Sequence, residues 1–275
     1  MTFQTPRGIV AADVGYTNTK LVLFDGNCQP VAERKVASRH LDGPPYRHID
    51  PEPMVALFRE VLPEFDRILP VDAVVPSAHG AALACLDGLG GLAMPIMDYM
   101  SEPPAEIVDA YREIMPSFFE AGCPLLPMAI THGLQLYWQS RAWPADFSRI
   151  TTVVPWIQYV GFRLSGRAVT EMSSMSCQTH LMDTRTQELS SLVRRCGWEG
   201  LFPPMAKAWE TIGTLRPEFC GTGLRGQGRV LGGVHDSTAN FMRYVCAGIG
   251  HFTLVSTGTW SISFDPATSL DILDP

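Results

Sequence analysis

The chain has 275 residues, of which 46% are hydrophobic and 18% charged, and its formal net charge is −7. This composition is typical of a folded globular protein of one large or two ordinary domains. The acidic balance offers no basic surface to nucleic acid or an anionic membrane, and no run of ~20 uncharged apolar residues predicts a membrane span. We therefore expect neither partner.

The seven cysteines are scattered and form no CxxC pair or Cys/His cluster. Unpatterned cysteines are typical of reduced thiols in a cytoplasmic protein. The first residues also lack the charged and apolar regions of a signal peptide. The sequence therefore predicts a cytoplasmic protein without a structural zinc site.

Short apolar runs in the first third of the chain predict buried strands. They cover residues 8–14, 20–24, 72–76 and 82–86, and residues 31–37 are a candidate for a further strand. Segment 40–53 is rich in proline and charge, which is typical of a surface loop. Residues 53–62 have the apolar spacing of a helix.

The middle of the chain is predicted to be mainly helical. Apolar residues at three- and four-residue spacing predict helices over 105–119, 131–140, 189–195 and 203–210. The glycine-rich segment 217–228 is predicted to be a linker or crossover. A strand over 229–234, a helix from Asp236 and a strand over 251–256 are expected after it.

This order of elements predicts two domains, over residues 1–228 and 229–275. The second segment, of about 45 residues, is too short to bury a core of its own. We therefore expect that the chain is a fragment, or that the full protein continues past Pro275, with its second domain truncated here.

Two stretches share one pattern: VAADVGYTNTKLVLF from Val10, and HFTLVSTGTWSISF from His251. Each passes from an apolar run through a small polar turn into another apolar run, so it connects strand to strand. Backbone N–H groups and hydroxyls at such a tip form a nest for phosphate oxygens, and glycine permits positive φ and close approach. The alternative is two ordinary β-hairpins, because Gly and Asn are common at hairpin tips.

Asp236 lies in GGVHDSTANF, at an expected junction from strand to helix. One interpretation is an N-cap that accepts the first free N–H groups of the helix. The other is a general base, kept ionised by the helix N-terminus, that accepts a hydroxyl proton as the oxygen attacks a γ-phosphate. One residue can fill both roles.

These motifs together resemble the FGGY carbohydrate kinases of the actin–hexokinase–Hsp70 superfamily. The resemblance rests on DVGYTNTK (13–20), HG (79–80), GVHDS (233–237) and STGTW (256–260), which occur in the family's order. It implies an α/β, two-lobed actin-like ATPase (ribonuclease H-like) fold, with the second lobe incomplete in this chain. It also implies a cytoplasmic kinase that uses ATP and Mg²⁺ to phosphorylate a sugar.

The implied substrate is a ketose or deoxyketose. HDS and STGTWS are most similar to the motifs of rhamnulokinase and fuculokinase, and the HG pair also resembles that of xylulokinase. L-rhamnulose, L-fuculose and D-xylulose are therefore the implied sugars. A homodimer is compatible with the sequence but not specified by it.

The resemblance implies roles for individual residues. Asp13 would orient Mg²⁺, mostly through water, and Asp236 would be the general base. The two phosphate hairpins would consist of Gly15, Thr17, Asn18 and Lys20, and of Gly258 and Thr259. The sugar would contact His79, Gly80, Asp98, His235 and Ser237. The adenine-binding residues of the family are expected beyond the end of the chain.

Tyr16 departs from the family pattern, which commonly has Thr at this position. Its bulk beside the phosphate turn favours an alternative, a catalytically inactive relative that senses sugar or nucleotide. An actin-like or chaperone-like ATPase is a third hypothesis. Asp236 beside His235 and Ser237 argues against both, because neither needs a hydroxyl-activating acid next to sugar-binding side chains. His132 and His180 are expected to be structural.

Overall fold

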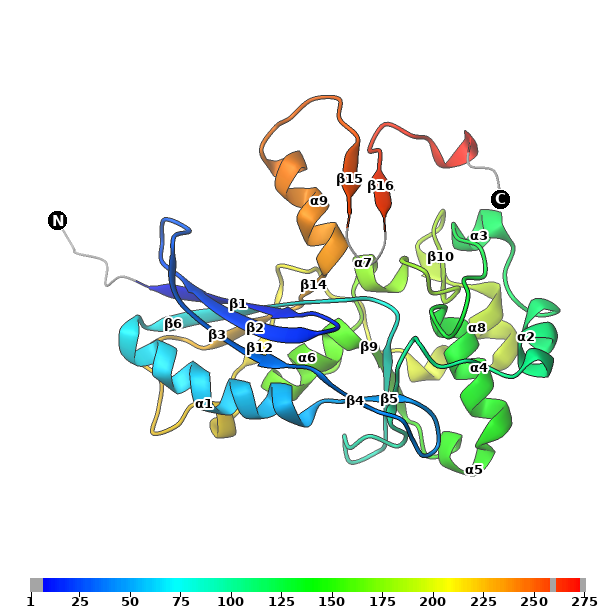
Figure 1. Ribbon diagram of the computed structural model, residues 1–275, viewed down its shortest axis with the longest axis horizontal. Helices are drawn as coiled ribbons and strands as arrows, with labels where there is room; N and C mark the ends of the chain where they lie inside the picture. The colour runs from blue at the N-terminus through cyan, green and yellow to red at the C-terminus, as the bar shows by residue number, and fades with distance from the viewer. Residues whose placement is uncertain (1–6, 258–260, 273–275) are drawn as a thin grey trace.

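The computed structural model describes residues 7–257 and 261–272 and confirms the α/β prediction (Figure 1). Its main sheet has seven strands in the order β12-β13-β6-β1-β2-β3, with β14 also paired to β6. The strands are β1 (Gly8–Val14), β2 (Asn18–Phe24), β3 (Pro30–Ala37), β6 (Val71–Ala78), β12 (Thr211–Thr214), β13 (Arg229–Leu231) and β14 (Val234–His235).

The direction of the strands sets the layout of this sheet. β1, β2 and β3 form an antiparallel meander, whereas β6, β13 and β14 run parallel to β1. β1 alternates between its two faces: Val10, Ala12 and Val14 are buried, while Ile9 and Asp13 lie on the exposed face. This alternation corrects the expectation of a strand buried on both faces, and it leaves Asp13 outside the core.

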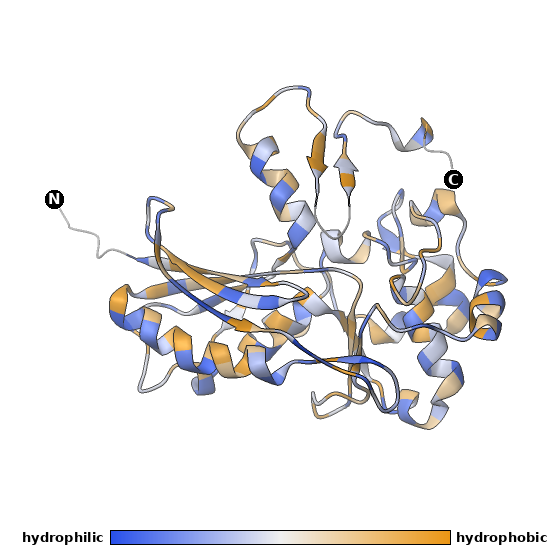
Figure 2. Ribbon diagram, viewed as in Figure 1, coloured by the Kyte–Doolittle hydropathy of each residue, from blue (hydrophilic) through white to orange (hydrophobic). Residues whose placement is uncertain are grey.

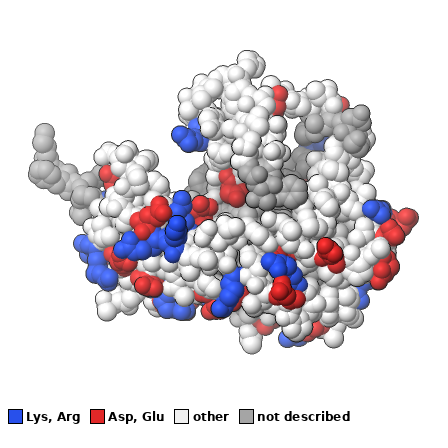
Figure 3. All heavy atoms as spheres, in the orientation of Figure 1, with Lys and Arg blue, Asp and Glu red and all other residues white. Residues whose placement is uncertain are grey.

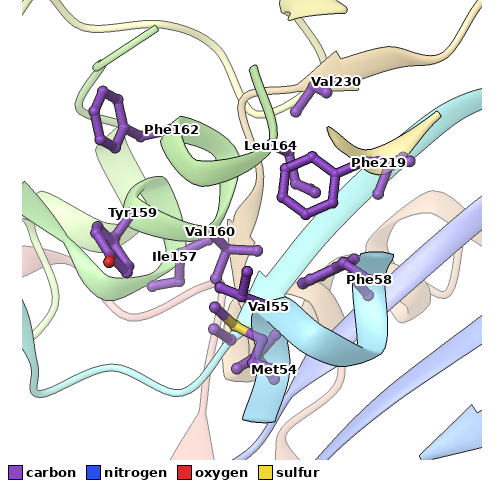
Figure 4. Packing of buried hydrophobic residues seen from close by; sticks show 14 of the residues in the cluster. Met54, Val55, Phe58, Ile157, Tyr159, Val160, Phe162, Leu164, Phe219 and Val230 are labelled. Carbon is purple, nitrogen blue, oxygen red and sulfur yellow. The ribbon is translucent and has the colours of Figure 1, made fainter. Parts of the chain in front are cut away.

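Helices α1 (Glu52–Ile68) and α6 (Trp156–Ser165) cover one face of the main sheet. The buried residues of α1 recur at three- and four-residue spacing, and hydrophobic residues run along β1, β2 and α1 in Figure 2. Figure 4 shows Met54 and Val55 of α1 packed near Ile157 and Val160 of α6. The opposite side carries α9 (Asp236–Cys246) and the hairpin β15 (Leu254–Ser256)–β16 (Ile262–Phe264).

A second core lies beside the sheet and is mainly helical. Its helices are α2 (Ala105–Arg112), α3 (Phe118–Ala121), α4 (His132–Ala142), α5 (Pro144–Phe147) and α8 (Ser191–Cys196). Other small sheets accompany the main sheet: β4 (Arg39–Leu41)–β5 (His48–Asp50)–β8 (Ile96–Met97), β7 (Leu83–Leu86)–β9 (Thr152–Pro155) and, among the helices, β10 (Met182–Asp183)–β11 (Glu188–Leu189). The remaining short elements are α7 (Met172–Met175), η1 (Glu199–Leu201), η2 (Pro217–Phe219) and η3 (Leu270–Ile272).

Three sequence predictions are wrong. Segment 40–53 is not a surface loop, because β5 pairs with the distant strand β8 and buries Ile49. Segment 203–210 is not helical: the Pro204 carbonyl and the Ala206 N–H both bond to the main chain of Thr170. The helix predicted over 105–119 ends at Arg112, four residues before Pro116.

The segment predicted as a linker, 217–228, packs on the hydrophobic core that the main sheet forms with helices α1 and α6. Phe219 is fully buried, and its ring meets that of Phe58 edge to face at 6.5 Å. The buried Asp66 carboxylate accepts the N–H groups of Arg225 (2.7 Å) and Gly226 (3.1 Å). The chain therefore enters β13 in a fixed register, and the strands on both sides of residue 229 belong to one sheet.

The distribution of charged side chains on the surface agrees with the acidic composition of the sequence. On the face in Figure 3, Lys and Arg are interspersed with Asp and Glu instead of forming one large basic area. Across the described parts of the chain, every helix is too short or too polar to cross a bilayer.

Removal of the Phe219 ring tests this packing. We expect Phe219→Ala to lower the free energy of unfolding by about 3–5 kcal/mol, because it removes a buried aromatic side chain and leaves a cavity. The exposed Phe119, in α3, is the matched control, and Phe119→Ala should change stability little. Urea unfolding of both variants is the measurement, and equal stabilities would show that segment 217–228 is not part of the core.

Candidate active site

Three parallel strands of the main sheet end at the same edge. Val14 of β1 lies opposite Ala78 of β6, and Ala78 lies opposite His235 of β14. The chain leaves each strand just beyond this level, so the β1–β2 turn, the His79–Gly80 pair and Asp236 meet there. Ligands commonly bind at the carboxyl ends of parallel strands. Three of the four sequence motifs are thus brought together.

The first predicted hairpin forms between β1 and β2. The Gly15 N–H donates to the Asn18 carbonyl (2.9 Å), and Thr17 and Asn18 are exposed at the tip. Gly15 is not in the left-handed region, contrary to expectation. Glycine is favoured there because a Cβ would lie 3.2 Å from the Asn18 carbonyl oxygen. The binding of phosphate at this tip stays a prediction.

Charged side chains flank the hairpin. Asp13 and Lys20 are direct cross-strand neighbours on β1 and β2. Partial burial raises the pKa of Asp13, while the charge of Lys20 opposes this rise and that of Asp236 adds to it. The two carboxylates are therefore close enough to repel each other.

The donor set at this point suits Mg²⁺ bound together with phosphate. Within residues 7–257 and 261–272, no three His, Cys, Asp or Glu side chains converge as a metal cluster. Mg²⁺ usually takes only one or two carboxylates and completes its shell with phosphate oxygens and water. Asp13 with Asp236 nearby fits this pattern, so Asp13 remains the candidate for holding the ion.

Gly80 makes room for His235. A Cβ on Gly80 would lie 2.7 Å from the Nε2 atom of His235, so any larger residue would displace the ring. Burial lowers the pKa values of His79 and His235, which favours neutral rings. His79 Nδ1 pairs with the Gly80 carbonyl at 2.7 Å, whereas His235 Nδ1 is buried without a partner.

Asp236 is the first residue of α9, and His235 occupies the N-cap. Its Oδ1 atom accepts the N–H (2.6 Å) and hydroxyl (3.2 Å) of Ser237, and its side chain is 39% exposed. The His235 N–H donates to Ser173 Oγ (3.1 Å), which donates to Glu171 (2.6 Å). The start of α9 is thus anchored while the carboxylate stays accessible, and the predicted N-cap falls one residue earlier.

A pocket of about 250 Å³ opens beside Asp236. Its lining includes the predicted residues His79, Gly80, His235, Asp236 and Ser237. The lining residues that the sequence did not predict are Ala81, Tyr99, Leu126, Ile130, Gln178, Ser261 and Ile262.

The pocket lining is chemically mixed. Ala81, Tyr99 and Ile130 form a buried cluster, against which Leu126 packs. We call these four residues the apolar wall. They come from the turns after β6 and β8 and from the segment before α4, where no local motif marks them. The HG and HDS motifs supply polar residues to the same lining, and the His79 ring meets that of Tyr99 edge to face at 6.1 Å.

Asp98 is brought near the hairpin but does not line the pocket. It is fully buried, and its carboxylate accepts hydrogen bonds from Tyr16, Arg47 and the Met100 N–H. Direct contact of Asp98 with sugar stays a prediction without geometric support. Lys20 and Asp13 lie at the hairpin and not in the pocket lining.

The two histidines expected to be structural are both buried. His180 pairs with the Tyr111 hydroxyl at 2.9 Å and with the Cys123 carbonyl at 3.2 Å. His132 has no hydrogen-bond partner, and burial lowers its pKa to about 3. Both rings thus fill core positions in neutral form.

The second predicted hairpin is described only in its strands. β15 and β16 pair antiparallel, with Ser256 opposite Ile262. Gly258 and Thr259, the residues predicted to bind phosphate, lie outside the described residues.

Comparisons with known proteins agree on one family. Residues 8–242 match the N-terminal domain model of the FGGY family of carbohydrate kinases. Among curated proteins, none gives a significant match.

Solved structures with the same fold include a carbohydrate kinase from Novosphingobium aromaticivorans, with 32% identity over 98% of this chain and a TM-score of 0.89. Xylulose kinases from Lactobacillus acidophilus and Rhodospirillum rubrum have 19% and 21% identity, cover 84% and 86% of this chain, and have TM-scores of 0.74. The chain spans 58%, 49% and 51% of these three structures. The predicted actin-like α/β fold is confirmed.

Asp13 should weaken the fold at neutral pH. Its raised pKa means that the folded chain takes up the proton more readily than the unfolded chain, so its charge opposes folding above about pH 4. We expect Asp13→Asn to unfold at a higher temperature than wild type at pH 7, without added Mg²⁺. The difference should shrink as the pH falls from the raised pKa of folded Asp13 toward 3.8, and it should vanish well below 3.8, where Asp13 is protonated in both states. A less stable Asn variant at pH 7 would contradict this electrostatic account.

Proposed function

Because the chain belongs to the FGGY family of carbohydrate kinases, we propose that it carries out ATP-dependent phosphorylation of a sugar hydroxyl. The observation that carries the proposal is the position of Asp236. Its carboxylate lies in the pocket at the N-terminus of α9, next to the β1–β2 hairpin and Asp13. A base, a candidate sugar pocket and a candidate phosphate turn thus share one sheet edge.

In this proposal Asp236 is the general base. The hydrogen bonds from the N–H and hydroxyl of Ser237 fix the orientation of the Asp236 carboxylate. It would accept the proton of the sugar hydroxyl while that oxygen attacks the γ-phosphate. His235 and Ser237 would hold neighbouring hydroxyls, which their place in the pocket lining supports. His79 and Gly80 would line the pocket beside His235.

ATP would lie along the hairpin. Gly15, Thr17 and Asn18 would cradle its phosphates, with Lys20 as a point charge. Mg²⁺, held by Asp13 through water, supplies charge neutralisation for the phosphates when it is bound. Gly258 and Thr259 would contribute a second turn. The proposed second lobe starts near residue 229, and α9 with β15–β16, outside the main sheet, are its described parts on the opposite face.

The proposed substrate is a ketose or deoxyketose such as L-rhamnulose, L-fuculose or D-xylulose. The apolar wall favours a deoxyketose among these, because a methyl group there would lose water without leaving a hydroxyl unpaired. The polar residues of the pocket would hold the hydroxyl that reacts.

The alternative, a catalytically inactive relative, depended on the bulk of Tyr16 at the phosphate turn. The Tyr16 ring instead packs against Tyr99 and His40, and its hydroxyl donates to Asp98. The ring thus packs on Tyr99, which lines the pocket, and the bulk of Tyr16 gives no support to an inactive site.

Removal of the base tests the proposed chemistry. We expect Asp236→Asn in the full-length protein to lower kcat by about 10²–10⁴-fold, because Asn cannot accept the hydroxyl proton. Sugar-dependent release of ADP is the measurement, and Asp109→Asn, at an exposed carboxylate on α2, is the matched control. Full turnover in Asp236→Asn, or hydrolysis of ATP independent of every sugar, would overturn the proposal.

Matched sugars test the role of the apolar wall. L-rhamnulose and L-fructose differ only by the hydroxyl on C6, and a hydrophobic surface discriminates such pairs by about 10²-fold at most. We expect kcat/KM to favour the deoxyketose by roughly 10- to 100-fold, and the same for L-fuculose over L-tagatose.

A variant of the wall should change this ratio. Ile130→Thr places a hydroxyl on the apolar wall and should lower the ratio of kcat/KM for the deoxyketose to kcat/KM for the matched ketose. Ile49→Thr, at a buried site in β5, should lower stability without changing the ratio. Equal kcat/KM values for both members of each pair would exclude recognition of a deoxy carbon while leaving the kinase proposal intact.

A further inference from the structure

A network of polar side chains lies beneath the hairpin tip, outside the pocket. Its centre is the Asp98 carboxylate, which is fully buried just after β8. Oδ2 accepts from the Tyr16 hydroxyl (3.1 Å) and from Arg47 Nε (2.9 Å), and it faces His40 Nδ1 at 2.7 Å. We call Tyr16, His40, Arg47 and Asp98 the Tyr16 clasp.

Tyr16 is held at two points by this clasp. His40 Nε2 lies 2.8 Å from the Tyr16 carbonyl oxygen, while its Nδ1 faces the Asp98 carboxylate. Both partners are acceptors, so a protonated nitrogen of the ring can donate to the partner that it faces. The main chain and the side chain of Tyr16 are thus both tied to Asp98.

The ring of Tyr16 also reaches the pocket lining. Its centroid lies 4.8 Å from that of Tyr99 and 5.9 Å from that of His79. Burial and the charge of Asp98 raise the pKa of Tyr16, so its hydroxyl stays protonated and donates. A residue at the turn between β1 and β2 therefore packs on two residues that line the pocket.

The hairpin tip is also held by its neighbour on the other side. From the β3 side, the Ser38 N–H donates to the Thr17 carbonyl (2.9 Å) and the Ser38 hydroxyl to the Gly15 carbonyl (3.0 Å). The clasp supplies the support from the pocket side. Charge-assisted hydrogen bonds of this kind are stronger than neutral ones.

We propose that Tyr16 is a positioning residue: the clasp fixes the tip of the β1–β2 hairpin against the floor of the pocket, so that a phosphate on the turn and a hydroxyl in the pocket keep one alignment. The alignment of phosphate and hydroxyl rests on the proposed kinase activity. The part of the inference that the clasp holds the hairpin tip does not depend on that activity. The sequence feature that suggested an inactive site thereby gains a role in an active one.

Tyr16→Phe is the direct test, because it keeps the ring and removes only the bond to Asp98. Tyr46→Phe is the matched control: the Tyr46 hydroxyl also bonds in the interior, to the Pro95 carbonyl (2.7 Å) and Gln139 (2.7 Å), but belongs to the second core. The measurement is hydrogen–deuterium exchange of the amides of residues 14–20. We expect these amides to exchange on the order of 10-fold faster in Tyr16→Phe and at the wild-type rate in Tyr46→Phe.

Kinetics of the full-length protein give the second readout. In Tyr16→Phe, kcat/KM for ATP should fall on the order of 10-fold while KM for the sugar changes little, because His79 and Tyr99 keep their other contacts. Tyr46→Phe should change neither. Rescue is not expected from raising the ATP concentration, since misalignment lowers kcat as well.

The two possible failures can be told apart. Unchanged exchange of residues 14–20 in Tyr16→Phe, or an equal rise in Tyr46→Phe, would overturn the clasp whatever the enzyme does. Faster exchange together with an unchanged kcat/KM for ATP would overturn the role of Tyr16 as a positioning residue. Absence of turnover with every sugar in the wild-type protein would instead reject the kinase proposal, while the exchange result would still decide whether the clasp holds the tip.

Discussion

The site depends on the parallel pairing of β6 with β1 on one side and with β14 on the other. Residues 14, 78 and 235 occupy one level across three strands, although more than 150 residues separate the last two. This register brings the β1–β2 turn, the HG pair and Asp236 to one edge of the sheet. A shift of β14 by one residue would turn His235 and Asp236 to the opposite faces, so the docked segment 217–228, which sets where β13 begins, matters to the site.

Much of this arrangement was predictable from local sequence. Continuous apolar runs identified β1, β2 and β6, and the Gly-Tyr-Thr-Asn turn identified the hairpin. The failures occurred where distant pairing decides the structure. β5 forms because β8 is available to it, and in segment 203–210 the main chain of Pro204 and Ala206 bonds to that of Thr170. Neither partner is visible in a local window, and helical spacing in 203–210 could not outweigh the adjacent Pro203 and Pro204.

The residues of the candidate site also divide into those predictable from local sequence and those that only the fold brings together. Its charged and polar members, Asp13, His79, His235 and Asp236, stand in short motifs that can be read from the sequence. The apolar wall cannot, because Ala81, Leu126 and Ile130 come from separate turns and are ordinary residues until the fold assembles them. Asp98 and Tyr16 were each recognised as unusual, but only the fold shows that they bond to each other. This hydrogen bond is the observation behind the proposed role of both residues as one support for the hairpin tip.

The central claim is that one sheet edge aligns a sugar hydroxyl, the Asp236 carboxylate and the phosphates on the β1–β2 turn. A crystal structure of the full-length protein with its sugar and a non-hydrolysable ATP analogue tests this claim most directly. The account predicts one sugar hydroxyl within hydrogen-bond distance of Asp236, with that oxygen directed at the γ-phosphate and the phosphates against residues 15–18. A sugar bound away from Asp236, or phosphates that do not touch the turn, would contradict it.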